Sequence, residues 1–431
     1  MKNKVLLWLF PGSLFILLIL SFNPWPAGHG SEIACGPTDT LLKRILGEDS
    51  IHPAKVLQQP AKYRVQVIYT QINRDSLNHP VFKEYRYRVD SQNYFYCASL
   101  VKLPCSALAL EKINDLSIPG LTAETHMLTD SSGPCQKKAW RDTGSADGFP
   151  SVAQYIKRML LISDNAAYNR IYEFTGPAYI SKKLTDKGYP RSYIIQRFDP
   201  GCKTEDNTIT NPIHFIAGNG SALYDQPAAI YEVPHSHPMG KPLVGRAYMD
   251  ADRKKVNKPR DFSKSNYLSL PDITTMLRSI VFPNSIEENR RFHLKPENRL
   301  MMLRYLSMLP RESVSPRYNS KQYPDNYKKY LIYGDLTFMM PQDSIRVFNI
   351  VGESYGFVSD VAYICDFKNG IEFMLSAVIY ANEGEIINNN KYDYKTIAMP
   401  WLSSLGKAFY NYEHARLRPY RPDLSEFRFS Y

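Results

Sequence analysis

Strand patterns in this chain fall into two groups, one towards each end, and helical patterns occupy most of the sequence between them. Residues 64–71 and 81–89 alternate between apolar and polar side chains, which predicts a hairpin with a long connection. Residues 344–351, 355–366 and 371–380 predict three further, consecutive strands. Helical periodicity is expected over residues 38–46, 99–113, 151–161, 165–174, 270–281, 297–308 and 394–414.

This order of elements predicts that the two chain ends join in one sheet. We expect a two-lobed α/β fold, in which an antiparallel sheet built from both ends carries flanking helices. An all-α lobe would be inserted between the second and third strands, and a site is expected in the cleft between the lobes. The 431 residues, 44% of them hydrophobic, are ample for such a core.

The N-terminus has the features of an export signal. Lys2 and Lys4 precede a largely apolar run over residues 5–20, and a Pro-rich stretch at 24–28 ends that run. We expect residues 1–28 to be a signal peptide and the body to work in the periplasm or cell envelope. The alternative is an uncleaved membrane anchor, and only in that case is membrane association expected.

Six cysteines would meet an oxidising compartment after export. They stand at positions 35, 97, 105, 135, 202 and 365. Six cysteines allow 15 pairings, and these spacings select none of them. No paired zinc spacing is present, and His235 and His237 lack a carboxylate or cysteine at a suitable distance, so we interpret them as surface loop residues. Neither a metal nor a cofactor is expected.

The basic residues are spread along the chain, although the net charge is +11, or +9 without Lys2 and Lys4. A dispersed basic surface on an exported protein favours anionic cell-wall polymer or lipid as its surroundings, and we expect no nucleic-acid partner. Residues 217–265 form an irregular basic stretch that we interpret as an insertion. Residues 416–431 form a basic, aromatic tail.

The first chemical motif is Ser99-Leu100-Val101-Lys102, at the start of a predicted helix. A serine hydroxyl is a poor nucleophile until a base removes its proton. Residues three apart are neighbours on a helix, so the lysine amine can reach the hydroxyl. If the amine is desolvated, its pKa falls and it can act as a base near neutral pH. Backbone N–H groups at the helix start are also free to stabilise an oxyanion.

The motif Ser163-Asp164-Asn165 follows 64 positions after Ser99. Ser163 can relay a proton to a leaving nitrogen, and Asn165 can donate to a substrate carbonyl or contact the lysine. Asp164 can cap the following helix, which would be a purely structural role. A second Ser-x-x-Lys copy ends at Lys407 and has no such partner motif, so we interpret it as helix surface.

These motifs resemble those of class A β-lactamase-type serine hydrolases, in the wider penicillin-recognising serine enzyme family. The resemblance covers most of the chain after the signal. It is carried by the segments YFYCASLVKLP, ISDNAAYN, LSLPDITTMLRSIV and YGFVSDVAYICDFKNGIEFMLSAVIY. It implies a β-lactamase/transpeptidase-like fold over residues 36–415, in a chain longer than the compact resistance enzymes.

The resemblance also implies a role for each site residue. Ser99 would be the acylated nucleophile, Lys102 its base, and Ser163 the proton shuttle. Asn165 would contact the substrate. The oxyanion hole would use the backbone N–H groups of Ser99 and Glu353.

The third motif of the family departs from its usual pattern here. The family has lysine, then threonine or serine, then glycine, where this chain has Ile350-Val351-Gly352. Gly352 fits a close approach by the substrate backbone. Ile350 cannot bind a carboxylate, and Arg346, four residues away on the same face, is about 13 Å distant along a strand. β-Lactam affinity is therefore expected to be weakened.

The family's deacylation glutamate corresponds to Asp199, 36 residues after Ser163. The surrounding Arg197-Phe198-Asp199-Pro200 keeps the Arg-x-acid-Pro shape with a carboxylate shorter by one methylene. Asp199 could activate water. It could equally pair with Arg197 in a structural role.

Three functions fit this sequence. The first is an exported serine hydrolase that opens β-lactam or related amide or ester bonds through a Ser99 acyl-enzyme. The second is a D,D-peptidase or esterase that uses the same Ser99 and Lys102 on cell-wall peptide. The third is a cell-wall-binding protein that has lost turnover, which Ile350 favours. The substrate would be a small β-lactam or peptide-like molecule, and the sequence leaves the oligomeric state open.

Overall fold

The computed structural model describes residues 40–47, 51–90, 92–132, 137–198, 205–232, 236–335 and 343–431. The expected signal peptide, residues 1–28, lies outside the described residues. The helices are α1 (Thr40–Leu46), α2 (Lys55–Gln58), α3 (Lys102–Leu116), α4 (Val152–Ile162), α5 (Asn165–Thr175), α6 (Pro177–Asp186), α7 (Leu270–Val281), α8 (Pro296–Ser307), α9 (Tyr330–Tyr333) and α10 (Met399–Ala415). In the described part of the chain, no helix has the length and apolar character needed to cross a membrane.

The main sheet has five strands in the order β12-β13-β14-β1-β2. Its strands are β1 (Gln66–Arg74), β2 (Pro80–Tyr87), β12 (Ile345–Ser354), β13 (Phe357–Asp366) and β14 (Ile371–Tyr380). All neighbours are antiparallel, and β1 from the N-terminal part pairs with β14 from the C-terminal part. The prediction of one antiparallel sheet from both chain ends is confirmed.

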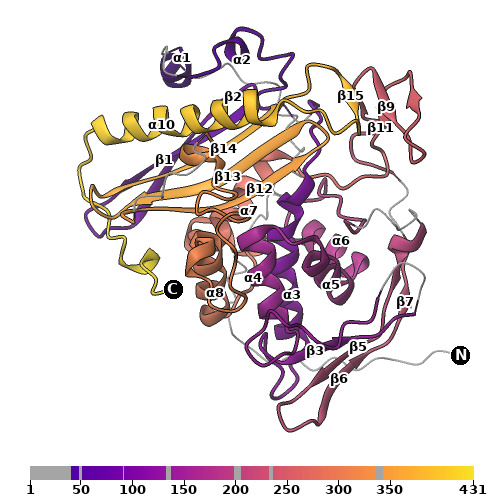
Figure 1. Cartoon of the computed structure of the whole chain (residues 1–431). Helices are drawn as coiled ribbons and strands as arrows, with labels where there is room; N and C mark the ends of the chain where they lie inside the picture. Colours follow the sequence, from indigo (N-terminus) through magenta and orange to yellow (C-terminus); the bar gives the residue numbers. More distant parts are fainter. Residues whose placement is uncertain are drawn as a thin grey trace, which may run out of the picture. The chain divides into compact units, whose positions relative to one another are not determined.

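Helices cover both faces of this sheet because its side chains are apolar on both faces. Val67 and Tyr69 of β1 belong to a core shared with α10, whereas Ile68 and Ile72 belong to the core of the helical lobe. Figure 1 shows α10 along one face and α7 with α8 on the other. The strand β1, which was predicted from its alternating pattern, is therefore buried on both faces.

The helical lobe surrounds α3, which contacts α4, α5, α6 and α7. Almost all of its side chains are buried, including Lys102 and Glu111. The lobe also carries the three-stranded sheet of β3 (His126–Thr129), β5 (Ile213–Ile216) and β6 (Ala222–Gln226). The chain returns to the main sheet through α7 and α8, so the lobe is inserted between β2 and β12 as expected. The expectation that this lobe is all-α is wrong, because β3, β5 and β6 form a small sheet in it.

The basic stretch 217–265 contains short strands where we expected irregular structure. Together with neighbouring segments these are β4 (Ile209–Thr210), β7 (Ala229–Ile230), β8 (Leu243–Val244), β9 (Ala247–Met249), β10 (Lys255–Val256), β11 (Arg260–Asp261) and β15 (Ile386–Ile387). The surface position expected for His237 is wrong. Its side chain packs against the rings of Tyr94, Tyr193 and Tyr267 because this stretch folds back onto the body, and only 5% of the residue is exposed. His235 lies outside the described residues.

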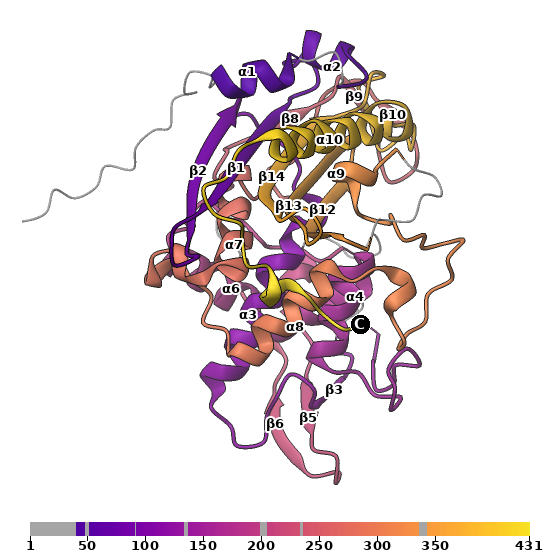
Figure 2. The same cartoon turned by 90° about the vertical axis from the view of Figure 1, so that its left-hand side faces the viewer.

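The C-terminal tail, residues 416–431, packs on the body of the molecule. The ring of Phe427 is buried against Phe282 and Tyr363, and the Tyr431 hydroxyl lies 2.8 Å from Ser307 Oγ on α8. Figure 2 shows this segment crossing from α10 to α8. Apolar burial therefore attaches the tail to the body through Phe427, whereas Tyr420 is 46% exposed.

Three of the six cysteines lie in the described residues. Cys97, Cys105 and Cys365 are buried and unpaired with one another. Positions 35, 135 and 202 lie outside the described residues.

Candidate active site

Ser99 lies at the point where the chain turns into α3. The preceding residue, Ala98, has a φ of 44°, a left-handed conformation that costs energy for any residue with a Cβ. A 3₁₀ turn, Ala98–Val101, follows and leads directly into α3, whose first residue is Lys102. Lys102 Nζ lies 2.9 Å from Ser99 Oγ. The first motif therefore has the hydroxyl–amine contact that its spacing predicted.

Lys102 also contacts both polar side chains of the second motif. Its Nζ lies 2.9 Å from Ser163 Oγ and 2.8 Å from Asn165 Oδ1, and it donates to the Ser163 carbonyl. An ammonium has three N–H donors, which cannot satisfy four oxygens at once. A neutral amine also has only three hydrogen-bonding positions, two N–H donors and one lone pair, so the four oxygens share them in either charge state. Only the neutral form can accept the Ser99 hydroxyl proton, through its lone pair.

Burial shifts the acid–base behaviour of Lys102. The residue is fully buried, and desolvation holds the pKa of its amine well below the ordinary 10.5. The positive charge of Lys328 lowers this pKa further, while Asp164 opposes the shift. Ser99 and Ser163 are partly exposed and Asn165 is exposed, so a small molecule can reach the hydroxyls but not the amine.

The second motif is held rigidly by its own central residue. Ser163 ends α4 in the left-handed conformation, with φ 59°, and its N–H donates back into the last turn. Asp164 accepts the Ala167 N–H at 3.0 Å as the N-cap of α5, and its other oxygen accepts two bonds from Arg158. Asp164 therefore has the structural role that the sequence allowed, and it fixes the side chains on either side.

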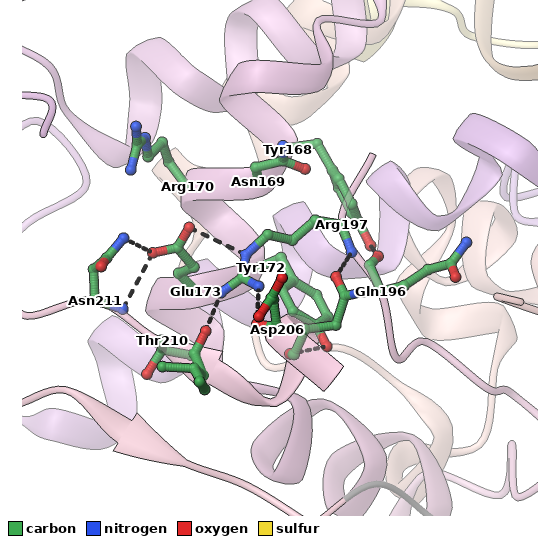
Figure 3. Close-up of polar contacts among 12 residues, drawn as sticks. Tyr168, Asn169, Arg170, Tyr172, Glu173, Gln196, Arg197, Asp206, Thr210 and Asn211 are labelled. Carbon is green, nitrogen blue, oxygen red and sulfur yellow. Dashed lines mark hydrogen bonds and ion pairs between the residues drawn. The ribbon is translucent and has the colours of Figure 1, made fainter. Parts of the chain in front are cut away.

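Arg197 connects the described residues on the two sides of Asp199, because it lies before Asp199 and contacts residues 206 and 209 after it. Its guanidinium donates to Asp206 O at 2.8 Å and to the Ile209 carbonyl, and its Nε lies 3.3 Å from Glu173 Oε1 (Figure 3). The Glu173 carboxylate in turn accepts from Asn211 Nδ2 at 3.0 Å. The guanidinium pairs with Glu173 of α5, which is fully buried. The Arg197–Asp199 pair that was one expectation involves a residue outside the described part of the chain.

Asp199 itself lies outside the described residues. Its neighbour Phe198 is described, and the Phe198 ring centre lies 5.4 Å from Lys102 Nζ. The Phe198 N–H donates to Asn169 Oδ1 of α5 at 2.8 Å. Phe198, the last described residue before Asp199, therefore lies beside the lysine.

Gly352 of β12 is close to the nucleophile for a reason that the sequence did not reveal. A Cβ at this position would lie 2.5 Å from Cys97 O and 2.7 Å from Ser359 Oγ. We expected glycine to admit substrate, whereas the immediate neighbour is the backbone two residues before Ser99. Glu353 follows, and its carboxylate accepts a hydrogen bond from the Tyr330 hydroxyl.

Neither Ile350 nor Arg346 brings a cation to the site. Ile350 is only 3% exposed and belongs to the main hydrophobic core. Arg346 donates to both oxygens of Glu312, at 3.0 and 2.8 Å, and stacks on the Tyr431 ring. The absence of the third-motif lysine is thus not compensated from the same strand.

Lys328 is a cation near the site that the sequence reasoning missed. Its Nζ lies 2.8 Å from the Tyr330 hydroxyl and 3.7 Å from Glu353 Oε2. Its positive charge contributes to the lowered pKa of the Lys102 amine. The signal in the sequence was the lysine pair between Tyr327 and Tyr330.

A buried network fixes the position of Lys328. The neighbouring Lys329 is fully buried and donates to Leu306 O, Val347 O and Asn349 Oδ1, at 2.6 to 2.8 Å. Desolvation lowers the pKa of Lys329 to about 7. Asn349 Nδ2 donates to Lys328 O at 2.8 Å. The loop is therefore fastened to β12 at the residue after Lys328.

The second Ser-x-x-Lys copy forms no comparable site. Lys407 Nζ pairs with Asp335 at 3.1 Å, and the Ser404 hydroxyl bonds to the backbone of His52. Its lysine therefore does not activate its serine. Within the described residues no group of acidic, histidine and cysteine side chains could hold a metal ion.

Comparison with known proteins gives one family match. The model of the beta-lactamase enzyme family matches residues 55–412, and no curated protein matches the sequence. Among solved structures, a class A β-lactamase from Clostridium kluyveri is 13% identical, with a TM-score of 0.46 over 83% of this chain and 98% of that one. A β-lactamase from Sphaerobacter thermophilus is 12% identical (TM-score 0.45; 85% and 95%), and PBP-A is 15% identical (0.43; 86% and 97%). Because the family model covers most of the sequence, the chain belongs to the β-lactamase enzyme family.

Proposed function

We propose that this protein is an exported serine hydrolase that opens β-lactam or related amide or ester bonds through an acyl-enzyme on Ser99. The observation that carries the proposal is the contact of one buried amine, Lys102 Nζ, with Ser99 Oγ, Ser163 Oγ and Asn165 Oδ1. The depressed pKa of this amine favours its neutral, proton-accepting form.

The reaction begins when the Lys102 amine accepts the Ser99 hydroxyl proton. Ser99 Oγ then bonds to the substrate carbonyl carbon, and the backbone N–H groups of Ser99 and Glu353 are the proposed donors to the oxyanion. As the C–N bond breaks, the leaving nitrogen takes the Ser163 hydroxyl proton, and the Lys102 ammonium returns its proton to Ser163. The amine is neutral again and the acyl group is an ester of Ser99.

Water must then attack the ester to complete a turnover. Asp199 is our candidate for the base that activates this water, on the basis of its sequence position and the nearby Phe198. The alternative, a D,D-peptidase or esterase on wall peptide, uses the same Ser99 and Lys102 and needs the same release of the acyl group by water. The buried apolar side chain of Ile350 favours the other alternative, a wall-binding protein without turnover.

Substrate orientation needs a cation, and we assign this to Lys328 in place of residue 350. The amine lies beside Glu353, which follows the glycine packed against the Ser99 turn. A substrate carboxylate would exchange the 3.7 Å contact with Glu353 for a charge-assisted hydrogen bond to Lys328.

Mass spectrometry of the intact protein after incubation with benzylpenicillin tests the proposal. We expect one adduct of the full mass of the penicillin, mapped to Ser99 and absent from Ser99→Ala. Ser404→Ala is the matched control, since it removes the serine of the second copy and should leave labelling unchanged. Labelling that persists in Ser99→Ala would contradict the proposal.

A further inference from the structure

A polar pocket of about 570 Å³ adjoins the Ser99 site. Asn165 and Phe198 line the pocket, and both also contact Lys102. Tyr96, three residues before Ser99, is another part of its wall. The pocket is therefore continuous with the place where the substrate carbonyl would be held.

Part of the pocket lining comes from the 217–265 stretch, and this part includes two cations. Arg260 of β11 and Lys264 both line it. Lys264 is exposed, whereas Arg260 is partly buried. Residues from outside the three motifs thus give the pocket a positive character.

Arg260 is held in position by aromatic rings. Its guanidinium carbon lies 4.7 Å from the ring centre of Tyr355, at the tip of the β12–β13 hairpin, and 5.4 Å from that of Phe262. Its Nη2 reaches the Tyr355 hydroxyl at 3.5 Å. Stacking of this kind orients a guanidinium while leaving its N–H edge available to an anion.

The charge of Arg260 is not matched by a protein carboxylate. Among the residues that the structure describes, no acidic side chain forms an ion pair with Arg260 or with Lys264. The acid in the lining, Asp261, accepts the Ser263 N–H at 2.8 Å and lies 3.6 Å from Lys241. The other lining guanidinium, Arg197, is already paired with Glu173.

We propose that this pocket, with Arg260 as its principal cation, binds an acidic group on the acyl portion of the substrate. The proposal rests on the proposed function, because that function sets which end of the substrate lies here. The leaving nitrogen is placed at Ser163, and the carboxylate on the leaving side is assigned to Lys328, which does not line this pocket. Arg260 is therefore assigned to a second anionic group, on the acyl side of the substrate.

Binding of two unreactive amides tests the pocket without any chemistry at Ser99. Phenylacetamide and the monoamide of phenylmalonic acid differ by one carboxylate. Dissociation constants for both would be measured with the full chain by ligand-observed NMR at constant ionic strength. We expect the monoamide to bind about tenfold more tightly, as one charge-assisted hydrogen bond to a guanidinium allows.

The variants identify the residue responsible. Arg260→Gln should reduce the preference to less than about twofold, and Arg260→Lys should keep part of it because the charge remains. Lys258→Gln is the matched control, since it removes an exposed positive charge two residues away that does not line the pocket.

Two sets of results would overturn the proposal. One is that the unaltered protein binds the two amides equally, or binds neither. The other is that the preference survives Arg260→Gln, or is lost to the same degree in Lys258→Gln. A penicillin that fails to label Ser99 would instead refute the proposed hydrolase function, and this binding preference would still be measurable.

Discussion

The carbonyl oxygen of Cys97 lies 2.5 Å from the position that a Cβ on residue 352 would take. Gly352→Ala should therefore push β12 away from the Ser99 turn. We expect a loss of about 1–3 kcal/mol in the free energy of unfolding, as for other overpacked sites, together with slower acylation of Ser99. Denaturant titration and the labelling rate measure the two effects. Gly218→Ala is the control, because nothing lies within 4 Å of its Cβ, and equal behaviour of the two variants would contradict the packing argument.

The low pKa of Lys102 predicts a specific pH dependence of acylation. The base is active when neutral, so the rate of Ser99 labelling should fall with decreasing pH through the native pKa of Lys102, well below 10.5. A stopped-flow series with a chromogenic cephalosporin would measure this profile. A rate that rises only near pH 10.5 would mean that the amine is not desolvated during the reaction.

The same shift predicts how stability changes with pH. Between the native pKa of Lys102 and 10.5, the unfolded chain binds a proton on this amine that the folded chain does not. Stability should thus rise with pH in this interval by up to about 1.4 kcal/mol per pH unit from this group, a contribution that Lys102→Met removes. Comparing the pH dependence of unfolding for the two proteins checks the sign, and parallel curves would exclude the effect.

Lys328→Gln should weaken recognition of the substrate carboxylate. We expect the second-order rate of acylation to fall by about 10- to 100-fold for a penicillin, as for loss of a charge-assisted hydrogen bond. Because Lys328 lowers the pKa of Lys102, the acid limb of the pH profile should also move to higher pH. Lys321→Gln changes an exposed lysine of the same loop region and serves as the control. An unchanged limb would show that the two amines do not interact.

Arg197→Gln should destabilise the fold because it leaves the Glu173 carboxylate buried without its partner. Both side chains are at most 1% exposed, and breaking such a pair costs about 3–5 kcal/mol. Arg86→Gln breaks the more exposed pair with Glu84 and should cost less than about 1 kcal/mol. Similar losses in the two variants, measured by chemical unfolding, would mean that the Arg197 contacts contribute little.

Asp199→Asn tests the deacylation step separately. If Asp199 activates water, the adduct on Ser99 should form at the normal rate and persist much longer, as followed by mass spectrometry over time. Release at an unchanged rate would leave Asp199 without a catalytic role.

Local patterns in the sequence predicted the features that depend on neighbouring residues. The alternation in β1 and the apolar runs of β13 and β14 gave the sheet, and the three-residue spacing of Ser99 and Lys102 gave their contact. The position of Ser163 beside Lys102 followed from the family resemblance, since no local rule brings together residues 61 positions apart.

Features that depend on tertiary contacts could not be predicted in this way. Arg197 pairs with Glu173 on α5, 24 residues earlier in the chain, and no local pattern in the sequence indicates this buried pair. His237 was expected in a loop, and burial between aromatic rings depends on how a long segment folds back. Lys328 is placed by the neighbouring Lys329, whose acceptors come from α8 and β12.

Lys329 attaches the segment that carries Lys328 to α8 and β12, and this attachment has a consequence for how the protein can diverge. The positive charge of Lys328 is carried by a connecting segment, whereas Ser99 lies in the 3₁₀ turn before α3 and its base, Lys102, is the first residue of α3. Because Lys328 also lowers the pKa of Lys102, exchange of that segment would alter both the binding of anionic substrates and the basicity of the amine that activates Ser99. One connecting segment therefore couples substrate recognition to the pH at which acylation proceeds.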